Sequence, residues 1–302
     1  MSKEVPSFSS AKYWDKRFQD NPQSFEWLLP ESCFDEELDA FRKHDGDHDH
    51  HDGDDCVTST RPVLHIGPGT SMLSFHLKTF MGPRYVIHNV DFSQESVDWG
   101  ERKEKEVDQA DETRSQLPTM RWSRVSLLSL SSLLSVARPR SVRLIVDKST
   151  SDAIACGLDV RINISPSSDV RVGTSSSKDG SAVRTTKVHP LHILALNLAV
   201  ISAPEARWIS LSYSKERYPF LPTLFAPFPD PLPDGFPDPN RYWKLRRQKE
   251  IQTEQKIPEN FRDTFAFVHR PVTSHYMYVL ERTEEELAVA VVEKLNAQAE
   301  ER

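Results

Sequence analysis

Residues 63–71 read Val-Leu-His-Ile-Gly-Pro-Gly-Thr-Ser, and a second apolar run, residues 85–90, ends at Asp91. The first segment predicts a short buried strand that leads into a tight Gly-x-Gly turn. The glycines of such a turn let the backbone approach a ligand, and an acid at the end of the second strand accepts hydrogen bonds from ribose hydroxyls. The pattern therefore predicts a nucleotide-binding α/β sheet, with Gly67, Gly69 and Asp91 in its site.

Further apolar runs extend this pattern to a whole sheet. Parallel strands are predicted at residues 120–125, 142–146 and 207–212. Because strand and helix alternate along the chain, we predict a doubly wound, mostly parallel sheet with right-handed crossovers. Two late runs, residues 265–269 and 276–280, predict a terminal pair of strands. Together the runs predict a seven-stranded sheet with an antiparallel C-terminal strand.

Three other segments sharpen this interpretation. Residues 13–18 read Tyr-Trp-Asp-Lys-Arg-Phe, residues 25–27 read Phe-Glu-Trp, and residues 147–153 read Asp-Lys-Ser-Thr-Ser-Asp-Ala. With the Gly-x-Gly turn, they resemble class I S-adenosylmethionine-dependent methyltransferases, and more narrowly the eukaryotic branch that includes lysine methyltransferases of translation elongation factor 1A. The resemblance covers residues 13–152. It implies a single Rossmann-like methyltransferase domain over residues 1–302, S-adenosylmethionine as cofactor, and methyl transfer to a lysine side chain of a protein such as an elongation factor.

The resemblance also implies which residues form the site. Trp14 and Phe18 cover the methionine end of the cofactor, and Arg17 is an alternative partner for the cofactor carboxylate, because a guanidinium makes bidentate contacts. The implied cofactor-binding residues are Trp14, Arg17, Phe18, Gly67, Gly69, Asp91, Phe92, Ser126, Leu127 and Lys148. No residue stands out as a general base, and the candidate catalytic residues are Glu26, Trp27, Asp147 and Tyr213.

Four positions depart from the pattern of that branch. His65 and Ser126 stand where acids are common, Ser149 replaces a glycine, and Phe18 replaces a tyrosine. These departures keep a catalytically silent cofactor-binding module open as an alternative. A small-molecule methyltransferase is another, since long insertions could roof a closed pocket. A nicotinamide-dependent oxidoreductase is disfavoured, because Met72 replaces the third glycine of Gly-x-Gly-x-x-Gly.

Several segments are predicted to lie outside the core of this domain. They are an N-terminal lid and substrate segment at 1–34, an acidic His/Asp-rich insertion at 44–60, a Ser-rich insertion at 165–187 and a Pro-rich insertion at 219–262. Residues 44–55 contain no apolar side chain, which predicts a solvated, disordered loop. Its histidines and carboxylates lack the fixed spacing of a metal site, so no metal is expected there.

Composition narrows the location and the partners. The three cysteines, Cys33, Cys56 and Cys156, follow no pattern, which favours a reducing compartment. The start of the chain lacks an apolar signal core, and no run approaches the roughly 18 apolar residues of a membrane span. We therefore expect a cytoplasmic protein that does not bind membranes. The net charge of −7 is concentrated in residues 35–55, so no basic face for nucleic acid is expected.

Overall fold

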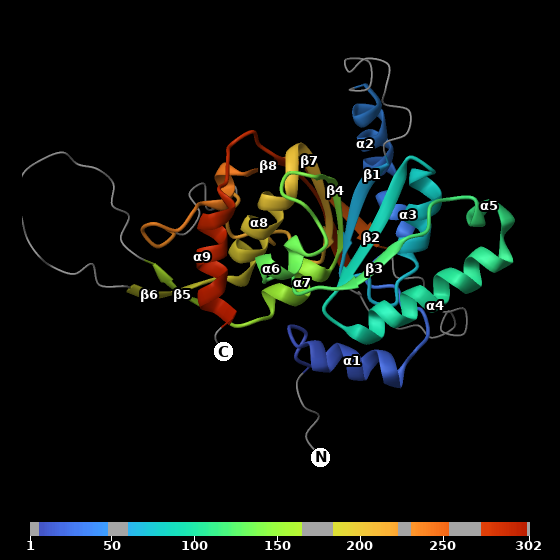
Figure 1. The fold of residues 1–302 in the computed structure, drawn as a ribbon, viewed down its shortest axis with the longest axis horizontal. Coiled ribbons are helices and arrows are strands. Elements are labelled where there is room, and N and C mark those ends of the chain that lie inside the picture. Colours follow the sequence, from blue (N-terminus) through green and yellow to red (C-terminus); the bar gives the residue numbers. More distant parts are fainter. Residues whose placement is uncertain (1–5, 48–59, 165–183, 223–230, 254–272, 301–302) are drawn as a thin grey trace, which may run out of the picture.

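The computed structural model describes residues 6–47, 60–164, 184–222, 231–253 and 273–300. In this part of the chain, seven strands form one sheet in the order β3-β2-β1-β4-β7-β9-β8 (Figure 1). They are β1 (Arg61–Ile66), β2 (Tyr85–Asp91), β3 (Arg121–Arg124), β4 (Val142–Lys148), β7 (Ser202–Ser212), β8 (Trp243–Thr253) and β9 (Thr273–Arg282). A separate small sheet pairs β5 (Val160–Ile164) with β6 (Arg184–Val188) in antiparallel orientation.

Helices cover both faces of the large sheet. They are α1 (Ala11–Asp20), α2 (Asp35–Asp47), α3 (Leu73–Met81), α4 (Gln94–Ala110), α5 (Glu112–Ser115), α6 (Leu130–Leu134), α7 (Thr150–Ala155), α8 (Pro190–Ile201) and α9 (Val289–Glu300), with short 3₁₀ helices η1 (Glu31–Phe34) and η4 (Pro239–Arg241). In Figure 1, α2 to α5 lie on one side of the sheet and α6, α8 and α9 on the other. Among the helices of the described residues, none is both long and apolar enough to cross a membrane.

The strand order places the topological switch point between β1 and β4. The chain runs from β1 outward to β2 and β3, and then returns to β4 on the other side of β1. All of these strands are parallel, and β7 continues the parallel order beyond β4. Among these seven strands only β9 runs in the opposite direction, since it lies antiparallel to both of its neighbours, β7 and β8. The structure thus confirms the predicted fold class, and ligands of such sheets bind beyond the carboxyl ends of β1 and β4.

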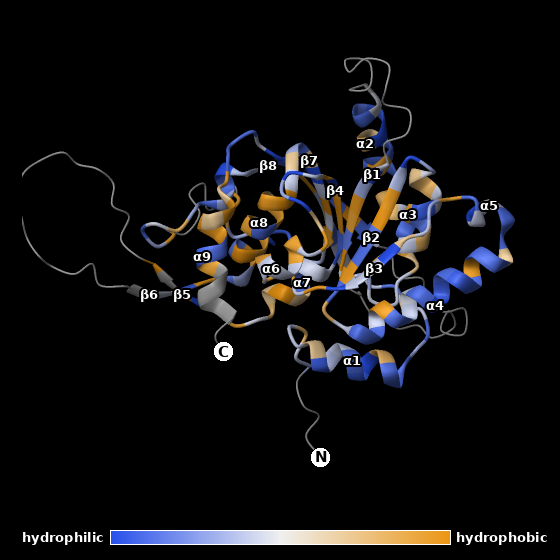
Figure 2. Cartoon of the chain, viewed as in Figure 1, coloured by the Kyte–Doolittle hydropathy of each residue, from blue (hydrophilic) through white to orange (hydrophobic). Residues whose placement is uncertain are grey.

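The central strands are apolar on both faces, which is why both faces are covered (Figure 2). Val63 belongs to one buried cluster with residues of α3, while its neighbour Leu64 belongs to a second cluster with residues of α8. All residues of α8 are buried, as expected for a helix between the sheet and another layer. The two cores hold the strand ends rigidly, and the loops at those ends build the site.

The prediction of the last strand pair was wrong in one member. The strand next to β9 is β8 (Trp243–Thr253), which lies inside the segment predicted as a Pro-rich insertion. The predicted strand at residues 265–269 lies outside the described residues, whereas the predicted strand at 276–280 lies within β9. Apart from Trp243, β8 is largely exposed and charged, because it is the edge of the sheet. An edge strand of this kind lacks the apolar alternation that marks a strand in sequence.

The acidic insertion also begins later than predicted. Helix α2 continues to Asp47, and within it Asp45 is fully buried. The Asp45 carboxylate accepts hydrogen bonds from Arg61 and from the Tyr85 hydroxyl at 2.8 Å, and it forms an ion pair with Arg143 at 2.8 Å. A run of acidic residues predicts a solvated face, but here three partners from β1, β2 and β4 compensate the buried charge. Residues 48–59 lie outside the described part of the chain.

Asp45→Ala is therefore expected to destabilise the protein. The substitution leaves buried donors of Arg61 and Tyr85 without their carboxylate, which costs about 2 kcal/mol of unfolding free energy. Asp39→Ala is the matched control on the same helix, because the Asp39 side chain is half-exposed and, among the described residues, its ion pair is with Lys43. Urea unfolding of both variants measures the difference. Equal stability of the two variants would mean that Asp45 does not anchor α2.

Candidate cofactor site

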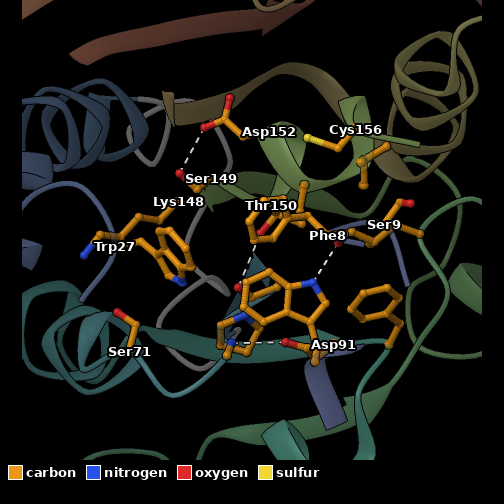
Figure 3. Close-up of a pocket in the computed structure, with 18 of the residues that line it drawn as sticks. Phe8, Ser9, Trp27, Ser71, Asp91, Lys148, Ser149, Thr150, Asp152 and Cys156 are labelled. Carbon is orange, nitrogen blue, oxygen red and sulfur yellow. Dashed lines mark hydrogen bonds between the residues drawn. The ribbon is translucent and has the colours of Figure 1, made fainter. Parts of the chain in front are cut away.

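A pocket of about 580 Å³ opens where β1, β2 and β4 end (Figure 3). This volume is typical of small-molecule sites, which span roughly 300–1,000 Å³, and the lining is mostly apolar and aromatic. Of the residues predicted from sequence, those that line it are Trp14, Phe18, Trp27, Gly67, Gly69, Asp91, Phe92, Ser126, Leu127, Lys148 and Tyr213. Arg17, Glu26 and Asp147 are not among the lining residues. The structure thus brings most of the predicted site together at the switch point of the sheet.

The Gly-x-Gly turn has the conformation that requires glycine. Gly67 and Gly69 have φ values of 59° and 53°, in the left-handed region that side chains disfavour. A Cβ atom on Gly67 would stand 2.2 Å from Thr150 Oγ1, and one on Gly69 would stand 3.2 Å from the Phe18 ring. Thr150 in turn donates a hydrogen bond to Ile66 O at 2.9 Å, which fastens α7 to the turn. The absence of side chains therefore serves both the turn and the packing of its neighbours.

Asp91 holds this turn against the start of α4. Its Oδ2 accepts hydrogen bonds from Gly69 N at 3.0 Å and from Ser96 Oγ at 2.9 Å, and its Oδ1 accepts one from Ser93 N at 2.9 Å. Burial raises the pKa of this carboxyl above its usual value, although these three donors oppose the rise. Oδ1 accepts one hydrogen bond in this arrangement, so it can accept a second from a ligand hydroxyl.

The N-terminal segment lies over the pocket, as predicted for a lid. The Trp14 indole is buried and donates to Phe8 O at 2.7 Å, and its ring packs 5.5 Å from that of Phe18. The segment is fastened by hydrogen bonds from Phe25 N to Thr70 O at 3.1 Å and from Trp99 Nε1 to the carbonyl of Pro22 at 2.8 Å. These contacts describe a closed cover, and its opening remains a prediction.

Arg17 does not point into the pocket as the alternative role would require. Its guanidinium lies over the rings of Phe25 and Trp27, with centroid distances of 5.0 and 5.5 Å. Such cation–π contacts stabilise an exposed site by about 0.5–1 kcal/mol. Arg17 therefore stiffens the segment that carries these rings, and a contact with the cofactor carboxylate would require it to leave them.

Asp147, a candidate catalytic residue, faces the interior instead of the pocket. It is fully buried, its Oδ1 accepts from Thr150 N at 2.9 Å, and its Oδ2 accepts from the Ser151 and Ser210 hydroxyls. Burial is the largest cause that raises its pKa to about 6. The carboxylate thus caps the start of α7, which is the usual role of an acid just before a helix. Tyr218 adds to this buried network by donating to Ser151 at 3.3 Å.

Sequence reasoning missed the groups that surround Asp152. Asp152 pairs with Arg217 at 2.6 Å and accepts hydrogen bonds from the Ser212 and Ser149 hydroxyls at 2.5 and 3.0 Å. The guanidinium of Arg217 also lies 4.9 Å from the centroid of the Tyr213 ring. Lys148, four residues before Asp152 in the sequence, pairs with Glu26 instead. Only the return of the chain after β7 brings Arg217 to this place.

Ser149 occupies a backbone conformation that favours glycine, the residue that the resemblance leads one to expect at this position. Its φ of 65° lies in the left-handed region. A non-glycine residue there costs roughly 1–2 kcal/mol. Its hydroxyl donates to Asp152, which offsets part of that cost. The departure at Ser149 therefore leaves the backbone conformation of this loop intact.

His65 lines the pocket and forms a neutral, buried network with its neighbours. Its Nδ1 lies 2.9 Å from Ser74 Oγ and 3.0 Å from Asn89 Oδ1. Burial lowers its pKa to about 4, so the imidazole is uncharged at neutral pH. An acid at this position would carry a negative charge, whereas His65 carries none.

The buried His65 predicts a pH dependence of stability. The folded pKa of about 4 lies below the unfolded value of 6.5, so the folded state binds fewer protons and stability falls as the pH is lowered through this window. Between pH 7 and pH 5 this single group should remove about 2 kcal/mol. In urea unfolding, His65→Gln should lose about 2 kcal/mol less stability than the wild-type protein between pH 7 and pH 5. His88 shifts in the same direction and Asp147 in the opposite one, and both remain in the variant. Parallel pH curves would contradict the assignment.

No protein-family model matches the chain. Over 157 residues the chain is 32% identical to the methyltransferase SrdJ of Neurospora crassa, and the match covers 51% of this chain and 57% of that protein. The chain therefore spans little more than half the length of this curated relative. The match supports the predicted methyltransferase class, and the sheet order agrees with it. The chain has the predicted α/β fold, a doubly wound, mostly parallel seven-stranded sheet with one antiparallel strand.

Solved structures with similarity to the chain include two of very low sequence identity. One is the N-methyltransferase NodS from Bradyrhizobium japonicum in complex with S-adenosylhomocysteine, with 9% identity, a TM-score of 0.40, and coverage of 93% of this chain and 100% of that chain. The other is TrmN from Thermus thermophilus, with 13% identity, a TM-score of 0.39, and coverage of 74% and 44%.

Proposed function

We propose that the chain is an S-adenosylmethionine-dependent methyltransferase. The observation that carries the proposal is the pocket at the ends of β1, β2 and β4, in which Asp91 accepts a hydrogen bond from the Gly-x-Gly turn and keeps capacity for a ribose hydroxyl. The first amide groups of α3 bind within the protein: Met72 N donates to Glu26 and Leu73 N to the Ser71 hydroxyl. They are not available to a pyrophosphate, which disfavours a dinucleotide.

The residues around the pocket can position the reactants and exclude water. When bound, the cofactor supplies a methyl group on a sulfonium sulfur, which an acceptor nitrogen takes while the carbon–sulfur electron pair stays on sulfur and the amine proton passes to solvent. Trp14, Phe18 and Trp27 cover the pocket with apolar rings. A dry, aromatic wall favours the neutral form of an amine, which is the form that reacts.

The acceptor in this proposal is a lysine side chain of a protein. Three apolar residues both line the pocket and reach the surface: Leu158, Tyr213 and Phe25 are 92%, 53% and 45% exposed. Exposed apolar side chains at the mouth of a pocket suit contact with another macromolecule. A lysine has a long apolar stem that can pass such a mouth and carry its amine inward. The resemblance favours an elongation factor as the partner.

Transfer of a labelled methyl group tests this proposal. The purified protein is incubated with a cell extract and S-adenosylmethionine that carries a tritiated methyl group. We expect label in acid-precipitable protein, recovered as methyl-lysine after hydrolysis. Label found only in the low-mass fraction would support a small-molecule acceptor. Clear binding of the cofactor without any transfer would support a silent binding module.

A further inference from the structure

An ion pair lies at one end of the pocket. Glu26, from the N-terminal segment, pairs with Lys148 at the end of β4. Figure 3 shows Lys148, Trp27 and Ser71 at this end, and Ser9 and Cys156 at the other. We propose that this pair binds the amino-acid group of the cofactor, with Lys148 on its carboxylate and Glu26 on its ammonium. The inference rests on the proposed function, because it assigns charges within the same site.

Lys148 lines the pocket and has donors that no described residue uses. Its side chain is 3% exposed and lines the pocket, and among the described residues its ammonium has one hydrogen-bond acceptor, Glu26 Oε2. An ammonium has three donors, so two remain for a ligand. Glu26 supplies the counter-charge that a buried lysine requires. A zwitterionic amino-acid group can place its carboxylate against Lys148 and its ammonium against Glu26, so that each charge of the ligand has an opposite partner.

Other donors near this end are already engaged within the protein. The first turn of α3 would be the usual site for a carboxylate. Here Glu26 Oε1 accepts from Met72 N at 2.5 Å, and the Ser71 hydroxyl accepts from Leu73 N at 3.1 Å. Arg17 is engaged with the rings of Phe25 and Trp27, on which its guanidinium stacks. Among the described residues at this end, Lys148 is the cation that a ligand carboxylate reaches without displacing a contact.

The other hydrogen-bond acceptors near this end of the pocket are also engaged within the protein, which leaves Glu26 as the partner for a ligand ammonium. His65 is neutral and its Nδ1 is engaged with Ser74 and Asn89. Asp152 pairs with Arg217, and Asp147 is sealed beneath α7. Glu26 does not itself line the pocket, but its Oε2 accepts hydrogen bonds from two residues that do, Lys148 and Ser71, and its side chain is 30% exposed. Among the described residues its Oε1 accepts a single hydrogen bond, from Met72 N, and so retains capacity for a ligand ammonium.

The order of the strands gives the pair the correct separation from the ribose acid. Asp91 ends β2, Lys148 ends β4, and β1 lies between these strands. Neighbouring strands are about 4.8 Å apart, so the two ends are separated by roughly 10 Å. In an extended cofactor molecule, a similar distance separates the ribose hydroxyls from the amino-acid group. The pair therefore lies where the amino-acid group ends if Asp91 binds the ribose.

Calorimetric titration with three ligands tests the assignment atom by atom. S-adenosylhomocysteine carries both charges, decarboxylated S-adenosylmethionine lacks the carboxylate, and methylthioadenosine lacks the whole amino-acid group. Lys148→Met should weaken S-adenosylhomocysteine about 30-fold and leave the other two ligands unchanged. Glu26→Gln should weaken both ammonium-bearing ligands about tenfold and leave methylthioadenosine unchanged. Lys16→Met, on the exposed face of α1, is the control and should change none of the three.

The outcomes separate this inference from the proposed function. If Lys148→Met weakens all three ligands equally, the lysine has only a structural role and the inference fails. If it weakens none, Lys148 is not in the site. The wild-type protein gives a second measurement that needs no variant, since S-adenosylhomocysteine should bind at least about 100-fold more tightly than methylthioadenosine. Equal affinities would overturn the inference, whereas failure of every ligand to bind would overturn the proposed function instead.

Discussion

Gly67→Ala is expected to lower the free energy of unfolding by about 4 kcal/mol and to abolish measurable binding of S-adenosylhomocysteine. The left-handed φ of 59° accounts for roughly 1–2 kcal/mol of this loss. The new methyl group would also stand 2.2 Å from Thr150 Oγ1 and 2.7 Å from its Cγ2. Thr150 cannot turn away without losing its hydrogen bond to Ile66 O, so overpacking adds roughly 1–3 kcal/mol.

Gly82→Ala separates the two causes. Gly82 also has a left-handed φ, 79°, but a Cβ atom there would meet no heavy atom within 4 Å. Its ψ of −170° places Gly82 in a region that essentially only glycine occupies, so this variant should lose roughly 1–3 kcal/mol in urea unfolding. It should keep its affinity for S-adenosylhomocysteine, because Gly82 lies at the far end of α3. If Gly67→Ala costs no more than Gly82→Ala, close packing of the turn against Thr150 is not what makes Gly67 necessary.

Asp91→Ala is expected to have the second largest effect. It removes a buried acceptor from Gly69 N, Ser93 N and Ser96 Oγ, which should cost about 3 kcal/mol of unfolding free energy. Loss of the ribose contact and of the tethered turn should weaken S-adenosylhomocysteine about 100-fold. The effect on binding is therefore coupled to an effect on stability, because the same carboxylate serves the ligand and the loop.

Asp15→Ala provides the matched control for this prediction. Asp15 is a neighbouring carboxylate that accepts a hydrogen bond from the Ser93 hydroxyl at 2.5 Å, but it does not line the pocket. Calorimetry should show nearly unchanged affinity for this variant and a large loss for Asp91→Ala. Similar affinities for the two variants, both well folded, would remove Asp91 from the ligand site.

The parts of the site that the sequence predicted well are those set by local spacing. Gly67, Gly69 and Asp91 follow from the geometry of one strand, turn, helix and second strand, and the structure brings all three to the pocket. The parallel order of the sheet determines which strand ends meet, so Lys148 and Ser126 could also be placed near them. These placements need no knowledge of how distant side chains pair.

The features that the sequence did not predict depend on contacts between distant residues. Glu26 and Lys148 are 122 residues apart, and nothing in either segment indicates that they form an ion pair. Asp45 belongs to a run of acidic residues typical of a solvated loop, yet it is buried by partners on three strands. Strand β8 is charged because it is an edge, so it lacks the periodicity by which strands are recognised. In each case tertiary structure overrides the local pattern.

The central claim is that this pocket binds a sulfonium nucleoside cofactor and not a dinucleotide. Calorimetric titration of the purified wild-type protein with S-adenosylhomocysteine, and separately with NAD, tests it most directly. The account predicts one S-adenosylhomocysteine bound per chain, lost in Asp91→Ala, and no heat of binding with NAD. Binding of NAD, or the absence of any binding of S-adenosylhomocysteine to the folded protein, would contradict it.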